Sequence, residues 1–305
     1  MTTATRSGVL VVDKPAGVTS FDVVGHVRTR LGVRRVGHAG TLDPAATGVL
    51  PVLIGEATKL MSYIADHDKE YRAVVRFGVR TDTQDMSGRI LSETALPALE
   101  REVVAAAMRQ FVGRIRQTPP MYSALHHEGR RLYELAREGL EVERAPREVA
   151  VHRFDVEQLG DGRATLRVVC GKGTYVRTLV ADLGDALGVG AAVEQLTRLR
   201  VGPFTISEAV AGGELREIAR ATLEAHIVPP AAALGAWPEI RLDHARADAF
   251  RHGQALESGP ETPGLVRVHE TDGAFIGVGA VDGTRRLRPI RILHADRSDA
   301  RVLPA

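Results

Sequence analysis

Residues 37–50 hold three glycines, one proline and few large side chains. Glycine and proline at this density interrupt helices and strands, so the stretch predicts a sharply turning loop that any fold must accommodate. Asp43 is the only acid between Asp22 and Glu56, while the preceding run 23–42 carries four arginines and two histidines. A lone carboxylate beside a cationic run favours chemistry on a polyanion.

A structural interpretation of Asp43 is equally acceptable from the residues alone. Asp43-Pro44 is typical of a helix start, with aspartate as the N-cap and proline at the first helical position. Helix signals of this kind are preferences, so the pattern leaves both the capping role and the catalytic role open.

Two stretches show clear periodicity. Val23, Val24, Val27 and Leu31 fall on one helical face, with a capping box at Thr19–Asp22 before them and Gly32 as the stop. Residues 69–77 alternate as a strand should, with Tyr71 starting the apolar face. On this pattern alone, Tyr71 is an ordinary core tyrosine. A further apolar stripe at Leu99, Val103, Val104, Ala107 and Phe111, ended by Gly113, predicts another helix.

The composition is that of a globular protein with room for one large and one small domain. The chain has 305 residues, of which 44% are hydrophobic and 26% charged. Its one cysteine, Cys170, excludes an intramolecular disulfide and a cysteine-based zinc cluster, and fits a reducing compartment. The apolar run 8–12 is too short for a signal-peptide core or a membrane span, so we expect a cytoplasmic protein.

Basic residues are clustered rather than general. The net charge is only +2, yet residues 109–147 hold eight arginines against five acids, around Pro119-Pro120 and Tyr122. This segment predicts either an RNA-binding region or an exposed loop and helix without special purpose. His126-His127 lacks a third ligand at metal-site spacing, and the acids at 82–85 fit a hydrogen-bonded loop better than a metal site. Gly-Lys-Gly at 171–173 lacks the phosphate-loop spacing. We therefore expect no metal and no cofactor.

Several stretches together resemble one family. Gly37-His38-Ala39-Gly40-Thr41-Leu42-Asp43-Pro44-Ala45-Ala46-Thr47-Gly48-Val49-Leu50 is similar to the catalytic loop of bacterial TruB-type tRNA pseudouridine synthases. Further similar stretches are Lys14–Ser20, Lys69-Glu70-Tyr71-Arg72, Lys172–Thr178 and Gln195–Arg200. The first of these has a mainly structural role in the family. The resemblance covers approximately residues 8–210.

The resemblance implies isomerisation of the T-arm uridine at position 55 of tRNA to pseudouridine. The N1–C1′ bond breaks, the uracil turns and C5 bonds to C1′; no redox change or group transfer occurs, so no cofactor is needed. Asp43 would be the catalytic carboxylate. It could attack C1′, or abstract the C2′ proton, or, in a third route that we rank last, attack C6 of the base.

The resemblance also implies how the target base is held. The base must be flipped out of the folded T arm, at a cost of a few kcal/mol. Tyr71 would stack on the uracil, Tyr175 and Leu196 would line its pocket, and His38 would insert into the RNA. Without the resemblance, His38 could cap a carbonyl and Leu196 could be core. Arg177 is the candidate partner of the Asp43 carboxylate, with phosphate binding as the alternative.

The implied fold is α/β (α+β), with a mixed, largely antiparallel central sheet and flanking helices. Residues 1–232 would form the catalytic domain, with an RNA-gripping insertion at about 114–147. Residues 228–235 look like a linker, and 238–305 would form a small β-rich, PUA-like RNA-binding domain. Asp-Gly pairs at 272–273 and 282–283, between apolar runs, predict hairpins there.

We expect a monomer that binds tRNA and needs no protein partner. Two other function classes stay open. An RNA-binding or tRNA-folding protein, with catalysis secondary, would need the basic clusters but no aspartate in a shaped loop. A glycoside hydrolase needs a second carboxylate beside the first, which only an acid distant in sequence, such as Asp85, could supply.

Overall fold

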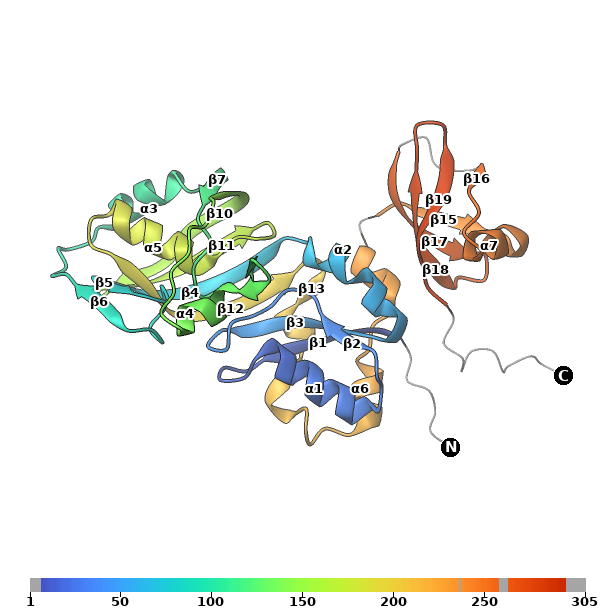
Figure 1. The fold of residues 1–305 in the computed structure, drawn as a ribbon, viewed down its shortest axis with the longest axis horizontal. Coiled ribbons are helices and arrows are strands. Elements are labelled where there is room, and N and C mark those ends of the chain that lie inside the picture. The colour runs from blue at the N-terminus through green and yellow to red at the C-terminus, as the bar shows by residue number, and fades with distance from the viewer. Residues whose placement is uncertain (1–6, 236, 258–262, 295–305) are drawn as a thin grey trace. The chain divides into compact units, whose positions relative to one another are not determined.

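The computed structural model describes residues 7–235, 237–257 and 263–294 (Figure 1). The chain divides into two compact units: unit 1 contains Met1–Asp43, Val49–Ala65 and Gly202–Ala305, and unit 2 contains Pro44–Gly48 and Asp66–Val201. The chain thus leaves unit 1 directly after Asp43. The division into a catalytic domain over 1–232 and a PUA-like domain over 238–305 stays a prediction.

Unit 1 begins with a small sheet in which β1 lies between β14 and β3, and the short β2 pairs antiparallel with β3. Strands β1 and β14 are parallel. The elements before residue 236 are β1 (Gly8–Lys14), α1 (Ser20–Leu31), β2 (Val36–His38), β3 (Thr47–Ile54), the 3-10 helix η1 (Gly55–Leu60), α2 (Met61–Ala65), β13 (Phe204–Thr205), η2 (Ile206–Glu208), β14 (Val210–Ala211), η3 (Gly212–Glu214), α6 (Arg220–Ala225) and η4 (Pro230–Leu234).

Helix α1 forms as its sequence predicts. Thr19 and Asp22 make the reciprocal capping box, and Gly32 ends the helix in the left-handed conformation, with φ of 66°. The buried face of α1, which includes Val27 and Leu31, packs into a core shared with β1, β3 and α6. This core fixes α1 against β2 and β3, the strands on either side of residues 39–46.

Unit 2 is built on an antiparallel sheet with the strand order β12-β4-β11-β10-β7. The first residues of β3, Thr47 and Gly48, pair in parallel with β12. The predicted mixed, largely antiparallel sheet with flanking helices is therefore confirmed. The elements are β4 (Lys69–Phe77), β5 (Val79–Thr81), β6 (Ile90–Glu93), α3 (Arg101–Arg109), β7 (Gly113–Gln117), β8 (His126–His127), β9 (Arg130–Arg131), α4 (Leu132–Arg137), β10 (Arg147–Gly160), β11 (Arg163–Cys170), α5 (Val176–Ala186) and β12 (Ala191–Val201).

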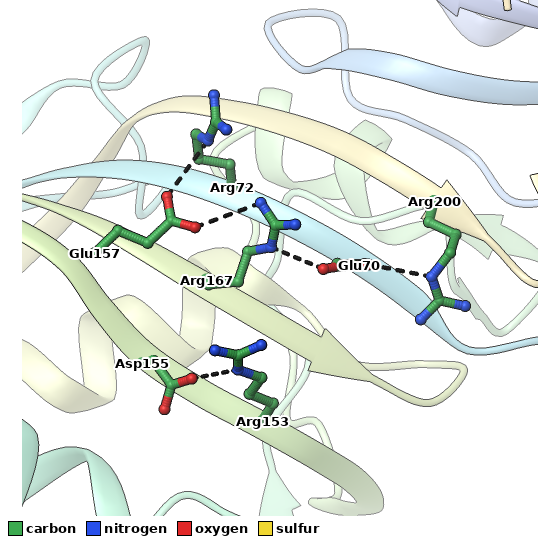
Figure 2. Close-up of polar contacts among 7 residues, drawn as sticks. All are labelled: Glu70, Arg72, Arg153, Asp155, Glu157, Arg167 and Arg200. Carbon is green, nitrogen blue, oxygen red and sulfur yellow. Dashed lines mark hydrogen bonds and ion pairs between the residues drawn. The ribbon is translucent and has the colours of Figure 1, made fainter. Parts of the chain in front are cut away.

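The sheet of unit 2 has one covered face and one open face. Along β4, alternate residues from Lys69 to Phe77 are buried, whereas the residues between them are half-buried or exposed. Helix α5 packs against β12 and β4, and α3 packs against β10 (Figure 1). On the open face, arginines and acids of neighbouring strands pair with each other (Figure 2). The predicted alternation of β4 is confirmed, with Tyr71 on the covered face.

The helical stripe predicted near residues 99–111 was only partly right. Helix α3 buries Val104 and Met108, while Val103 is 50% exposed. The residues one helical turn apart, 104 and 108, define the true face, and the adjacent Val103 points away from it.

The last part of unit 1 is a second sheet with the order β15-β17-β18-β19-β16. Its elements are β15 (Glu239–Leu242), α7 (His244–Arg251), β16 (Leu256–Glu257), β17 (Gly264–Glu270), β18 (Phe275–Val281) and β19 (Arg286–Ile292). The two predicted hairpins, β17-β18 and β18-β19, are confirmed. The expected linker at 228–235 was wrong: η4 forms there and buries Ala233 and Leu234. Among the described helices, none has the length and apolar character needed to cross a membrane.

Candidate active site

Asp43 lies in the loop that joins β2 to β3. These strands form a hairpin in which His38 pairs with Val52, and the amide of Ala39 donates to the carbonyl of Pro51 at 3.0 Å. No helix begins at Asp43: a turn follows it at residues 44–45, and the chain then enters β3. The helix-start interpretation of Asp43-Pro44 was therefore wrong, and Asp43 is a half-buried loop residue.

The unit 1 side of the loop is held by a serine. Ser20, the first residue of α1, accepts a hydrogen bond from the amide of Leu42 at 2.9 Å and donates one to the carbonyl of Leu42 at 3.1 Å. Both residues are buried, at 2% and 3% exposed. The sequence placed Ser20 in a capping box and in the family-like stretch Lys14–Ser20, but nothing local linked it to a residue 22 positions away.

The unit 2 side of the loop is held by β12. The hydroxyl of Thr47 lies 2.9 Å from the hydroxyl of Thr197, and Gly48 pairs with Arg198. A Cβ at Gly48 would lie 2.1 Å from the carbonyl oxygen of Arg198, and its φ of +103° suits only glycine. Gly48 is thus required for the close approach of the loop to β12.

Tyr71 lies on the covered face of β4 and is 9% exposed. Its cross-strand partner on β12 is Arg198, which is 1% exposed, and Lys69 precedes it on the same face. Burial, together with the charge of Arg198, lowers the pKa of Lys69 to about 8. The neighbouring Leu196 is half-buried and pairs with Ala73. Unit 2 therefore brings Tyr71 and Leu196 to adjacent strands.

Tyr175 lies directly before α5, and Gln117 holds it there. The side-chain amide of Gln117, at the end of β7, donates to the carbonyl of Tyr175 at 3.1 Å and accepts from its amide at 2.8 Å. Gln117 is only 2% exposed. No periodic signal singled out Gln117 in the sequence, because its partner lies 58 residues further along the chain.

Arg177 is buried within unit 2 and links α5 to two other segments of that unit. Its guanidinium donates to the carbonyls of Thr83 at 2.6 Å and Tyr122 at 2.8 Å, and its Nε lies 3.7 Å from the Asp85 carboxylate. Its side chain is 5% exposed, which suits an internal role better than phosphate binding. The pairing of Arg177 with Asp43 stays a prediction.

The loop that carries Asp85 is hydrogen-bonded internally, as predicted. The Asp85 carboxylate accepts from the Thr83 hydroxyl at 2.8 Å and from the Ser87 amide at 3.0 Å. Among the described residues, no three histidine, cysteine or acidic side chains gather in a way that could hold a metal ion.

Many arginines of the two basic clusters make internal contacts. Arg30 donates to the carbonyls of Ile218 and Glu217, and Arg35 pairs with Glu56 at 2.6 Å. In the 109–147 segment, Arg114 pairs with Glu148 and Arg144 donates to the carbonyl of Pro119. These arginines stabilise loops and strands of the protein, and RNA binding by the basic runs 23–42 and 109–147 stays a prediction.

A surface hollow of about 560 Å³ lies at the other end of β4, lined by Arg76, Phe77, Glu93, Leu96, Asp161 and Arg163. Phe77 lies six residue steps along an extended strand from Tyr71, or roughly 20 Å. This hollow contains none of the predicted site residues and adds nothing to the candidate site.

Known proteins give the same family for almost the whole chain. Residues 28–176 match the TruB family pseudouridylate synthase (N terminal domain) model, 177–234 the tRNA pseudouridylate synthase B C-terminal domain model, and 238–293 the Pseudouridine synthase II TruB, C-terminal model. The tRNA pseudouridine synthase B of Stutzerimonas stutzeri is 43% identical, with 95% of this chain and 96% of the relative covered. That of Symbiobacterium thermophilum is 50% identical, with 81% and 82% covered.

Solved structures agree on the fold. A Cbf5-Nop10-Gar1 complex contains a chain that is 25% identical, with a TM-score of 0.71 over 95% of this chain and 84% of that one. The archaeal box H/ACA sRNP Nop10-Cbf5 complex gives a TM-score of 0.73 at 21% identity, over 98% and 90%. The hairpin loop of Asp43, the strand of Tyr71 and the matches over nearly the full length lead to one conclusion: the chain belongs to the TruB family of pseudouridine synthases.

Proposed function

We propose that this protein isomerises the T-arm uridine at position 55 of tRNA to pseudouridine, with Asp43 as its catalytic carboxylate. The relatives over most of the chain are named tRNA pseudouridine synthase B, which supports tRNA as the substrate. The observation that carries the role of Asp43 is the construction of its loop: Leu42 on one side and Thr47 on the other are each held by side-chain hydrogen bonds.

The proposed reaction balances without a cofactor. The N1–C1′ bond breaks, C5 bonds to C1′, the hydrogen on C5 leaves as a proton, and N1 gains a proton. One carboxylate serves this chemistry, either by attacking C1′ or by taking and returning the C2′ proton. We rank attack on C6 third. A loop fixed on both sides suits any of these routes, because each needs the carboxylate held at one place.

The remaining site residues take supporting roles in the proposal. Tyr71 stacks on the flipped uracil, and Tyr175 and Leu196 line the pocket around it. His38, at the end of β2, inserts into the RNA from which the nucleotide was removed. Arg177 orients the Asp43 carboxylate, in addition to its contacts with Thr83 and Tyr122.

We infer further that the β-rich residues 238–305 form a PUA-like RNA-binding domain and that the protein acts as a cytoplasmic monomer. Five short strands and one helix support the first inference, and the single buried, free thiol of Cys170 supports a reducing compartment. Light scattering of the purified protein, alone and with tRNA, tests the monomer.

Tritium release from tRNA labelled at C5 of uridine tests the function, together with a tRNA-binding assay. We expect release by the wild type and none by Asp43→Asn, with binding kept in both. Asp161→Asn is the matched control, because Asp161 is in an exposed turn at a φ of 52° that asparagine tolerates. Tight binding without release by the wild type would favour the alternative, an RNA-binding or tRNA-folding protein in which catalysis is secondary. Release by Asp43→Asn would remove Asp43 from the chemistry.

A further inference from the structure

Ser20 makes an unusual pair of contacts beside the loop of Asp43. Its single hydroxyl accepts from the amide of Leu42 at 2.9 Å and donates to the carbonyl of the same residue at 3.1 Å. With Ser20 2% and Leu42 3% exposed, neither Leu42 group has ready access to water as a substitute partner. The hydroxyl therefore fixes both polar backbone groups of the residue that precedes Asp43.

The start of α1, which carries the Ser20 hydroxyl, is itself fixed by hydrogen bonds. The Thr19 amide donates to the Asp22 carboxylate at 2.8 Å, and the Asp22 amide donates to the Thr19 hydroxyl at 3.1 Å. The preceding turn is held by Lys14, whose ammonium group donates to the carbonyls of Pro15 and Val18, both at 2.8 Å. Lys14 is fully buried. Ser20 thus projects from a helix start that is anchored on both sides.

The geometry of the peptide bond carries this constraint to Asp43. The carbonyl of Leu42 and the amide nitrogen of Asp43 belong to one planar peptide group. A hydrogen bond on the Leu42 carbonyl fixes how that plane is rotated, and a second bond on the Leu42 amide fixes the plane before it. The direction in which the Cα of Asp43 presents its side chain then depends on the Ser20 hydroxyl.

We propose that Ser20 is a positioning residue for Asp43, which sets the carboxylate for the reaction without touching the substrate. This inference rests on the proposed function, in which Asp43 acts on the glycosidic bond. An error of about 1 Å in the place of a reacting group can lower a rate by roughly 100-fold. Loss of the hydroxyl is therefore expected to slow the chemical step and to leave tRNA binding unchanged.

The test compares Ser20→Ala with Thr205→Ala under single-turnover conditions, using tritium release for the rate and filter binding for the Kd. Thr205→Ala is the matched control, since it removes a capping-box hydroxyl from η2 but leaves the start of α1 and the bonds between Ser20 and Leu42 in place. We expect Ser20→Ala to lower the rate by about 10- to 100-fold at unchanged Kd, and Thr205→Ala by less than about twofold. Equal losses in both variants, or a loss that appears in the Kd, would overturn the proposal.

Thermal unfolding of both variants shows whether each is folded at the assay temperature. If Ser20→Ala is unfolded there, Ser20→Cys replaces it, because a thiol of similar shape donates and accepts only weakly. A slower single-turnover rate at unchanged Kd for Ser20→Cys supports the positioning role, and a rate equal to the wild type overturns it.

Wild type and Asp43→Asn in the same assay separate the two claims. Release by wild type but not by Asp43→Asn leaves the proposed function standing, so that the Ser20 variants judge the positioning role alone. No release by wild type, or release by Asp43→Asn, would refute the proposed function and the positioning role with it.

Discussion

The two faces of the unit 2 sheet differ in which protonation state they favour: the open face stabilises a charged carboxylate, and the covered face favours neutral forms. On the open face, Glu70 receives hydrogen bonds from Arg167 at 2.7 Å and Arg200 at 3.1 Å, and Glu157 lies 3.4 Å from Arg167 and 3.5 Å from Arg72 (Figure 2). Partial burial alone would raise the pKa of Glu70, but the two arginines outweigh it and lower the pKa. This face therefore keeps the Glu70 carboxylate charged.

On the covered face and the helix above it, burial favours neutral forms. It lowers the pKa of Lys69 to about 8 and raises that of the Cys170 thiol to about 11. Burial, with the charge of Asp185 added, raises the pKa of Asp182 on α5 to about 6. Tyr71 lies on this same covered face. Perturbed groups tend to gather at functional sites, so the covered face is where substitutions should matter most.

The two faces differ in whether the loss of one interaction partner can be compensated. On the open face, Glu70, Glu157 and Arg167 are partly exposed and each have two ionic partners, so the loss of one partner can be compensated. A polar group on the covered side depends on one or two defined partners. Substitutions of Arg177, Gln117, Glu70 and Asp182 test this contrast.

Arg177→Met should lower the free energy of unfolding more than the other three substitutions. It leaves the carbonyls of Thr83 and Tyr122 without their guanidinium donor and removes the charge near Asp85. Loss of one partner of a buried ionic group costs about 3–5 kcal/mol in the free energy of unfolding. Urea denaturation measures it, with Arg153→Met on the open face as the control. A loss below about 1 kcal/mol would show that the covered side is as tolerant as the open one.

Gln117→Leu should cost about 1–3 kcal/mol, since both backbone groups of Tyr175 that it serves lose a partner. At a temperature where the variant is folded, it should lower the rate of tritium release more than it lowers the affinity for tRNA. Gln110→Leu is the control, because Gln110 is exposed and its side-chain amide donates to the carbonyl of Ala107, three residues before it. Equal effects of the two glutamine changes would contradict the contrast.

Glu70→Gln should cost roughly 1–2 kcal/mol near neutral pH, through the loss of two charge-assisted hydrogen bonds. The pKa of Glu70 is lowered in the folded state, so its contribution is complete above the ordinary pKa of glutamate and is lost as the pH falls through the lowered value. The stability difference between wild type and variant should therefore shrink on acidification. A difference that does not change with pH would mean that the arginines do not respond to the charge of Glu70.

Asp182→Asn should stabilise the protein slightly, on the order of 1 kcal/mol near neutral pH. The folded state holds a proton on Asp182 up to about pH 6, so wild-type stability falls as the pH rises from the ordinary aspartate range to about that value. Asparagine removes this penalty, and the gain should vanish below about pH 4, where both states are protonated. Unfolding curves at several pH values measure it, and destabilisation at neutral pH would give Asp182 a role as a charged group.

Periodic and local signals in the sequence predicted much of this architecture. The alternation at 69–77 placed Tyr71 on the covered face, and the capping box at Thr19–Asp22 and the stop at Gly32 bounded α1 correctly. The 228–235 stretch misled because Pro229-Pro230 begins a 3-10 helix rather than a free linker. Proline at the start of a helix and proline in a linker look alike in a sequence.

The contacts that hold the site could not be predicted in the same way. Ser20 meets Leu42 across 22 residues, Gln117 meets Tyr175 across 58, and Arg177 meets Thr83 across 94. Each is a side chain bound to a backbone group, and backbone groups are the same at every residue. Only the fold decides which carbonyl or amide is within reach, so no residue pattern identifies the partner.

The division of the chain into units has a consequence for synthesis. Unit 2 is almost one continuous run, 66–201, whereas unit 1 needs residues beyond 202: β1 pairs with Val210, and the core that holds α1 includes Leu215 and Leu223. A chain growing on the ribosome can complete the strands around Tyr71 before it contains the residues that pair with β1 and pack against α1. The loop of Asp43, the proposed catalytic residue, would then be completed near the end of translation, when most of the protein has been made.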